Sequence, residues 1–341
     1  MLGATGLRTH IWNNNLKSVL LLAGFPFLLM LLALAASLVF VAFTGDGGGG
    51  YGAKSGAYGG SEFGAVMANW PQMALWSVII AGIWFVIAWF SHQAMIDAAT
   101  GAKKVTRAEQ PELYNLLENL CISRGITMPA LRIIETPQMN AYASGLTEKQ
   151  YSITVTTGLM QSLDSDELEA VLAHELTHVI NRDVRLLVIS VIFVGIFSFV
   201  AQLGVRAMFH GAVARSGRSR RGGGGNAAVL MIVAVGVIAL AWFLAIAIRF
   251  ALSRKREFMA DAGAVELTKN PDAMIGALEK ISGRAEMENA PSEIREMMIE
   301  NPKSGFSGIF MTHPPIEKRI EALVKFAGGR RNPGYSAVPT V

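Results

Sequence analysis

Five consecutive residues near the middle of the chain carry its strongest chemical signal: His174-Glu175-Leu176-Thr177-His178. On a helix, residues four apart lie on the same face, so the two imidazoles can bind one metal ion while Glu175 faces what that ion binds. The whole chain has six histidines, and with independent residue frequencies this pattern arises by chance in roughly one sequence in 200. The motif therefore predicts a catalytic zinc site, provided that the surrounding structure fits.

The residues before the motif predict the helix that must carry it. Asp164 and Glu167 stand three apart, as in a capping box that begins a helix. The apolar stripe that follows consists of Leu168, Val171, Leu172, Leu176 and Val179. At about 100° per residue, Glu175 falls inside this stripe and both histidines fall along its edge. Because a buried carboxylate is costly without a compensating ion or donor, the pattern favours a polar cleft.

Two histidines leave a catalytic zinc ion one protein ligand short, because such sites usually hold three side chains and an open position. The candidate segment is residues 253–262, where Glu257 and Asp261 stand four apart on a predicted helix. Glu257 can bind the metal, while Asp261 accepts a hydrogen bond from a ligand imidazole and orients it. The alternative is a solvated charged helix, and the upstream motif favours the ligand interpretation.

The composition indicates a membrane protein. The chain has 341 residues, of which 52% are hydrophobic, and a mean hydropathy of +0.38. Its apolar runs are residues 18–43, 70–95, 186–204 and 227–248. The net charge of +4 is mild, and the basic residues cluster beside these runs, so we expect no nucleic-acid partner. The single cysteine, Cys121, excludes an intramolecular disulfide and a cysteine-rich metal site.

The apolar runs predict a topology that brings the two parts of the site together. The first run is too long for a signal peptide and favours an uncleaved helix after a basic, cytoplasmic N-terminus. A second crossing returns residues 97–184 to the cytoplasm. The third and fourth runs form a hairpin whose loop at 215–225 is rich in arginine, which opposes a full crossing. We favour the crossing over a shallow dip, and both place the site on one side.

The segment between the second run and the motif has the character of a soluble domain. Residues 109–123 have helical spacing, with Pro111 in the first turn. Residues 131–135 and 151–157 are β-branched and predict two short strands, most simply an antiparallel pair. Residues 140–145 between them are typical of a turn, with a functional loop as the alternative.

Four motifs in order, at residues 140–145, 174–183, 254–261 and 312–320, closely resemble the HtpX family of membrane zinc proteases and, more distantly, the CAAX prenyl proteases. The resemblance implies one Zn²⁺ per chain, held by His174, His178 and Glu257, with Glu175 as the catalytic base. It also implies a stress-response role at the inner membrane, where a cytoplasmic catalytic domain degrades misfolded membrane proteins. The Gly-rich loop at 44–60 and the loop at 215–225 depart from the family pattern.

Three further residues complete the predicted site. The resemblance places a histidine opposite the metal, which favours His313, with Arg319 six residues later, as donors to the tetrahedral intermediate. The alternative is that His313 packs or caps a helix. Asn140 begins a segment that can form an edge for pairing with an extended substrate, so Asn140 and Arg319 are predicted to bind substrate. His92 is expected at the membrane interface and outside the site.

These observations predict a mainly α fold with a small β-sheet, in which a zincin-like metalloprotease domain is attached to a multi-helix membrane region. The predicted divisions are residues 1–17, 18–96 with the loop 44–70, 97–184, 185–248, 249–326 and a tail at 327–341. The expected activity is that of a zinc endopeptidase, and the expected partners are misfolded membrane proteins and the lipid bilayer. The rivals are an inactive scaffold, which has no need of Glu175, and a transporter, which the charge-free apolar runs disfavour.

Overall fold

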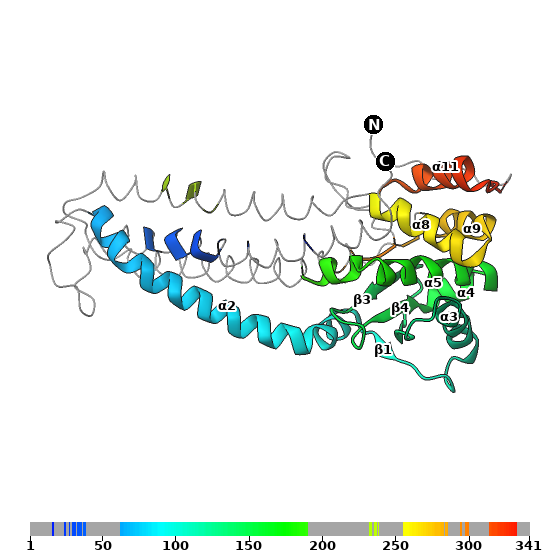
Figure 1. Ribbon diagram of the computed structural model, residues 1–341, viewed down its shortest axis with the longest axis horizontal. Coiled ribbons are helices and arrows are strands. Elements are labelled where there is room, and N and C mark those ends of the chain that lie inside the picture. The colour runs from blue at the N-terminus through cyan, green and yellow to red at the C-terminus, as the bar shows by residue number, and fades with distance from the viewer. Residues whose placement is uncertain are drawn as a thin grey trace. The chain divides into compact units, whose positions relative to one another are not determined.

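The computed structural model describes residues 62–189, 255–282, 284–285, 294, 297–299 and 314–332, with scattered residues between 16 and 38 and between 232 and 238. The chain divides into two compact units. One comprises Met1–Ser18, Phe90–Val191 and Phe250–Val341, and the other Val19–Trp89 and Ile192–Arg249. The first contains every predicted site residue and is called the motif unit below. Figure 1 shows the elements along the chain.

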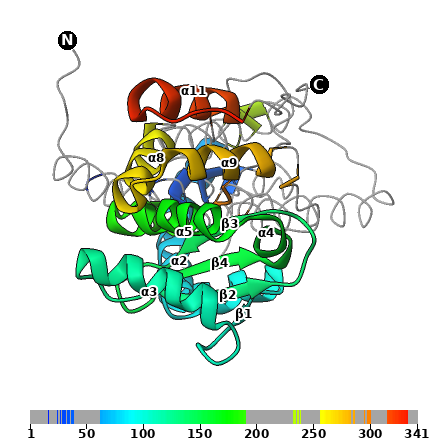
Figure 2. The ribbon, with the colours of Figure 1, turned by 90° about the vertical axis from the view of Figure 1, so that its right-hand side faces the viewer.

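A four-stranded mixed sheet forms one layer of the motif unit, with the strand order β1-β2-β4-β3 (Figure 2). Its strands are β1 (Lys103–Lys104), β2 (Ala130–Ile134), β3 (Ala141–Ser144) and β4 (Ser152–Thr156). The β2 and β4 strands are parallel, and β3 is antiparallel to β4. The expectation of a mainly helical fold with a small sheet is therefore confirmed. The multi-helix membrane region remains a prediction.

The predicted antiparallel pairing of residues 131–135 with 151–157 is wrong. The segment that was expected to be a turn contains the strand β3, so the chain reverses direction twice between β2 and β4. The turn follows β3 instead, at Gly145, whose φ of 125° disfavours any residue with a side chain. A Cβ atom at Gly145 would lie 2.6 Å from the carbonyl oxygen of Gln150.

Both helices predicted in this part of the chain are present. Helix α3 (Pro111–Arg124) begins two residues later than predicted, with Pro111 at its first position, and ends at Gly125 in the left-handed conformation. Helix α5 (Ser165–Ile180) has the predicted capping box: Asp164 Oδ1 accepts from the Glu167 amide and Glu167 Oε2 accepts from the Asp164 amide, both at 2.9 Å. Glu167 also forms an ion pair of 2.5 Å with Lys280, which ties the start of α5 to the next layer.

Helix α5 lies between the sheet and a second layer formed by α8 (Lys255–Thr268) and α9 (Pro271–Ile281), with α11 (Ile316–Ala327) beyond them (Figure 2). The α5 and α8 helices approach closely at Gly263. A Cβ atom there would lie 2.4 Å from Cγ2 of Thr177. This close packing places the helix that carries Glu257 directly against the helix that carries both histidines.

Helix α2 (Glu62–Thr100) contains the predicted second apolar run. Its Trp70–Thr100 portion is long and apolar enough to cross a membrane, with a mean hydropathy of 2.2 in its most apolar window. This portion is also exposed, for example at Ile80 (64%) and Phe90 (77%), unlike the core helix of a soluble domain. Of the four predicted apolar runs, the described residues cover only this one in full, and most of the others lie outside them.

Candidate metal centre

The structure brings the three predicted ligands together. The Nε2 atoms of His174 and His178 are 3.2 Å apart, and the two rings are nearly perpendicular, at 87°. Glu257 Oε2 lies 3.6 Å from His174 Nε2, and Oε1 lies 3.8 Å from His178 Nε2. All three side chains are buried, and one ligand atom from each lies within 4.8 Å of the others. This triangle of nitrogen and oxygen atoms has the size of a single-ion site.

Both histidines are oriented by carboxylates on the far side of their rings. His174 Nδ1 lies 3.0 Å from Asp261 Oδ1, as the sequence predicted for Asp261, and His178 Nδ1 lies 3.2 Å from Asp183 Oδ2. A proton on each Nδ1 leaves each Nε2 with its lone pair directed into the triangle. The role of Asp183 was missed. Arg182, with a φ of 60°, turns the chain just after α5 and brings Asp183 back to the ring.

Arg319 holds Asp261 in place from α11. Its Nε and Nη2 atoms donate to the two oxygens of Asp261 at 2.9 and 2.6 Å. Burial raises the pKa of Asp261, but the charge and hydrogen bonds of Arg319 outweigh this and lower the pKa below its usual range. Arg319 also lies 3.9 Å from Glu257 Oε2. It is fully buried behind the ligands, so its side chain supports the site directly.

The charges around the triangle leave room for a divalent cation. Four buried carboxylates face two buried guanidinium groups; these belong to Glu175, Asp183, Glu257 and Asp261, and to Arg256 and Arg319. When both imidazoles are neutral, as metal binding requires, and all four carboxylates are ionised, the excess of two negative charges matches an ion of charge +2. Buried charges that lack such compensation are costly, so the cluster itself favours a cation at its centre.

The pKa values of two groups in the cluster are raised, for different reasons. Burial is the largest effect on His174 and lowers its pKa, but hydrogen bonds to Asp261 and Glu257 outweigh it and raise the pKa to about 9. Burial raises the pKa of Glu175, and His174 and His178 oppose that shift only in part. His174 therefore holds a proton at neutral pH that a metal ion would displace. Two imidazoles and a carboxylate are a donor set that fits catalytic zinc.

Comparison with known proteins agrees with this donor set. The model of peptidase family M48 matches residues 107–327, which contain all three candidate ligands. This chain belongs to peptidase family M48. It is 43% identical over 332 residues to a protein of Bacteroides fragilis (strain YCH46) named Protease HtpX homolog, which covers 94% of this chain and 99% of that protein. The family resemblance expected from the motifs is confirmed.

Two further proteins are similar to the M48 chain. A Protease HtpX homolog of Ligilactobacillus salivarius (strain UCC118) is 33% identical over 319 residues, which cover 93% of this chain and 99% of that protein. The crystal structure of S. mikatae Ste24p matches with a TM-score of 0.45 and 17% identity, over 92% of this chain and 66% of that one.

The other residues singled out from the sequence of the M48 chain do not line the metal-binding triangle in the described part of the structure. Asn140 is 1% exposed, and its side chain donates to the Ala285 carbonyl at 2.8 Å and accepts from the Ile299 amide at 3.1 Å. Its side chain is thus engaged inside the protein, and a substrate-binding role remains a prediction. His313 lies outside the described residues. His92 is buried and lies outside the triangle.

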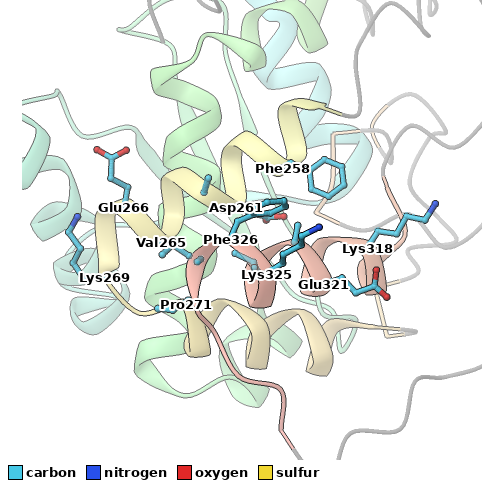
Figure 3. A pocket seen from close by; sticks show the side chains of 14 residues that line it. Phe258, Asp261, Val265, Glu266, Lys269, Pro271, Lys318, Glu321, Lys325 and Phe326 are labelled. Carbon is cyan, nitrogen blue, oxygen red and sulfur yellow. The ribbon is translucent and has the colours of Figure 1, made fainter. Parts of the chain in front are cut away.

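A groove of about 900 Å³ runs between α8 and α11 on the outer side of the motif unit (Figure 3). Phe258, Val265 and Phe326 contribute apolar walls, and Asp261 lines its floor. None of the metal-ligand candidates lines this groove. Among the residues of the candidate metal centre, Asp261 lines the groove, and its carboxylate is already bound by Arg319. We therefore do not place the substrate in this groove.

Proposed function

We propose that this M48 chain is a membrane-bound, zinc-dependent endopeptidase that cleaves misfolded or damaged membrane proteins. The family supports peptidase activity, and the donor set supports zinc as the metal. The observation that carries the proposal is the position of Glu175. It is a buried carboxylate that interacts electrostatically with both ligand histidines, and its Oε2 atom has no hydrogen-bond partner within the described part of the chain.

Each residue of the cluster has a role in peptide hydrolysis. Zinc held by His174, His178 and Glu257 would polarise the peptide carbonyl group and make water a better nucleophile. Glu175 takes a proton from the attacking water and passes it to the nitrogen of the leaving amine. Burial raises the pKa of Glu175 by more than His174 and His178 lower it. The raised pKa brings the proton affinity of this carboxylate closer to that needed both to accept and to donate a proton.

The proposed substrate site is the outer edge of β3. The carbonyl of Asn140 accepts from the Thr156 amide, so alternate residues of β3 face β4, and the main-chain groups of Ala141 and Ala143 face away from the sheet. A substrate in extended conformation can pair with this edge through its main chain. Such pairing depends little on side chains, which suits an enzyme that acts on unfolded segments.

The proposed location is the inner membrane, with several crossings and with the motif unit facing the cytoplasm. The exposed apolar surface of α2 supports a membrane anchor. The polar end of the same helix belongs to the motif unit, within which Arg132 forms an ion pair of 2.5 Å with Asp97. The multi-pass topology and the stress-response role rest on the apolar runs and the resemblance to the HtpX family.

The decisive experiment compares wild type with Glu175→Gln in detergent micelles, after both proteins have been loaded to the same measured zinc content. The substrate is an unfolded protein, and cleavage products are followed by mass spectrometry. We expect the variant to lose about 10²–10⁴-fold in rate, the typical contribution of a general base. Equal cleavage by both proteins would refute the proposal. No cleavage by wild type would favour an inactive scaffold.

A further inference from the structure

The main chain of Ile299 is held by the two residues for which the sequence predicts substrate binding. Asn140 Oδ1 accepts from the Ile299 amide at 3.1 Å. Arg319 Nη1 donates to the Ile299 carbonyl at 3.1 Å. The amide and the carbonyl group of Ile299 are therefore both bound by the side chains that we expected to bind the main chain of a substrate.

Ile299 also occupies the edge of β3 at which we place the substrate. Its amide donates to the outward-facing carbonyl of Ala141 at 2.9 Å. The amide of Ala141 is bonded to Asn140 Oδ1 at 3.0 Å, so both main-chain groups of Ala141 are already satisfied. In this arrangement β3 can offer an incoming strand Ala143 but no longer Ala141.

The position of Ile299 is linked to the candidate metal ligands by a single side chain. The guanidinium group of Arg319 that binds the Ile299 carbonyl also binds Asp261 and lies 3.9 Å from Glu257 Oε2. Ile299 thus lies between the proposed substrate edge and the cluster. Its side chain is 2% exposed, so this position already accommodates a large aliphatic group in a buried environment.

We propose that Ile299 is an internal stand-in for one residue of the substrate. A substrate displaces it, takes over its hydrogen bonds to Ala141, Asn140 and Arg319, and places an aliphatic side chain where that of Ile299 now lies. The inference rests on the proposed function, because it names a specificity of the same site. The competing view is that residues 297–299 are a permanent support for Asn140 and Arg319.

Displacement has a measurable cost for the substrate. When a site is free for only a fraction of the time, apparent affinity falls by that fraction, so an occupant in place about nine-tenths of the time weakens binding about tenfold. Ile299→Pro removes the amide hydrogen that Ala141 and Asn140 accept. Ile299→Val keeps both the amide and an aliphatic side chain and serves as the matched control.

The first test measures binding without turnover. The proteins are zinc-loaded Glu175→Gln alone and Glu175→Gln combined with Ile299→Pro or with Ile299→Val. Each is titrated with the peptide acetyl-Met-Met-Ile, which carries a fluorescent label joined to its C-terminus through an amide bond. We expect Ile299→Pro to lower the Kd by about five- to tenfold and Ile299→Val to leave it within about twofold. An unchanged or higher Kd in a folded Ile299→Pro variant would overturn the proposal.

The second test needs no substitution and so remains informative if Ile299→Pro fails to fold. Zinc-loaded wild type is given a peptide library, and the cut positions are mapped by mass spectrometry. We expect Ile, Leu and Val to exceed Asp, Lys and Gly by at least about tenfold in kcat/KM at one fixed position within about two residues of the cut. Cleavage without this preference overturns the inference alone, whereas a complete lack of cleavage contradicts the proposed function.

Discussion

The close approach of α5 and α8 predicts that a single methyl group can disrupt metal binding. A Cβ atom at Gly263 would lie 2.4 Å from Thr177 Cγ2 and 2.6 Å from Thr177 Oγ1, whereas carbon atoms in contact normally lie about 3.5–4.0 Å apart. Thr177 cannot easily rotate away, because its hydroxyl donates to the Ala173 carbonyl at 2.8 Å. Gly263→Ala should therefore move the helices apart by about 1 Å.

A displacement of this size matters because the ligands come from both helices. Distances in a metal site tolerate changes of about 0.2 Å, and the separations from Glu257 to His174 and His178 would all increase. We expect Gly263→Ala to lower zinc affinity by about 10–100-fold, the range found when residues that support ligands are changed. Overpacking of this kind typically also costs about 1–3 kcal/mol in the free energy of unfolding.

The assay is zinc binding by competition with a chromophoric chelator, together with chemical denaturation. The matched variants are Thr177→Ala, which removes the methyl group that the new Cβ atom would clash with, and the double variant Thr177→Ala with Gly263→Ala. We expect Thr177→Ala to bind zinc nearly as wild type does, and the double variant to recover most of the lost affinity. The reasoning is refuted if Gly263→Ala binds zinc normally or if the double variant is as weak as the single one.

Two further predictions concern the groups around the triangle. Because the pKa of His174 is raised to about 9, the imidazole is protonated at pH 7, and zinc binding at that pH should release at least about one proton. Calorimetry in buffers of different ionisation enthalpy measures this release, and zinc binding without proton release would contradict the prediction. Without metal, the stabilisation from this raised pKa is full below the ordinary value of 6.5 and is lost as pH rises through about 9, so the free energy of unfolding should fall between these values. Asp183→Asn should lower zinc affinity by about 10–100-fold while the far-ultraviolet circular dichroism stays unchanged, because the His178 ring loses its charged acceptor; equal affinity would show that Asp183 does not orient the ring.

The local parts of the site could be predicted because helical spacing determines them. The two histidines of α5 lie four residues apart, and the Asp164 capping box places the start of that helix. Glu257 and Asp261 show the same spacing on α8, and both reach the same imidazole. In each case the geometry within one helix depends on a few neighbouring residues, which the sequence displays directly.

The sheet could not be predicted in the same way, because β3 is stabilised by partners that are distant in sequence. Its small and polar residues are typical of a turn, but Ser144 and Ser152 both donate to Oε1 of Gln93 in α2, at 2.7 and 3.0 Å. Tyr142 lies 3.3 Å from the hydroxyl of Thr100, also in α2. These bonds allow polar side chains to be buried in a strand, and no local pattern reveals them.

The role of Arg319 shows the same limit within the site. Arg319 is buried against Asp261 and connects α11 to the ligands of α5 and α8, a supporting role that the sequence did not predict. Its function depends on which helix packs behind α8. The sequence shows that residue 319 is charged, but only the packing of the helices shows which carboxylate it pairs with.

This dependence on packing has a consequence for assembly. Glu257 follows His178 by 79 residues, and Arg319 comes from a third helix, so the cluster has its full charge only when α5, α8 and α11 are all in place. Without the cation, the excess of carboxylates opposes that packing; with it, the same carboxylates favour packing. A ligand that binds only the folded state at about 1,000 times its Kd adds about 4 kcal/mol of stability. The metal should therefore act both in the chemistry and in holding together a site whose parts are far apart in the sequence.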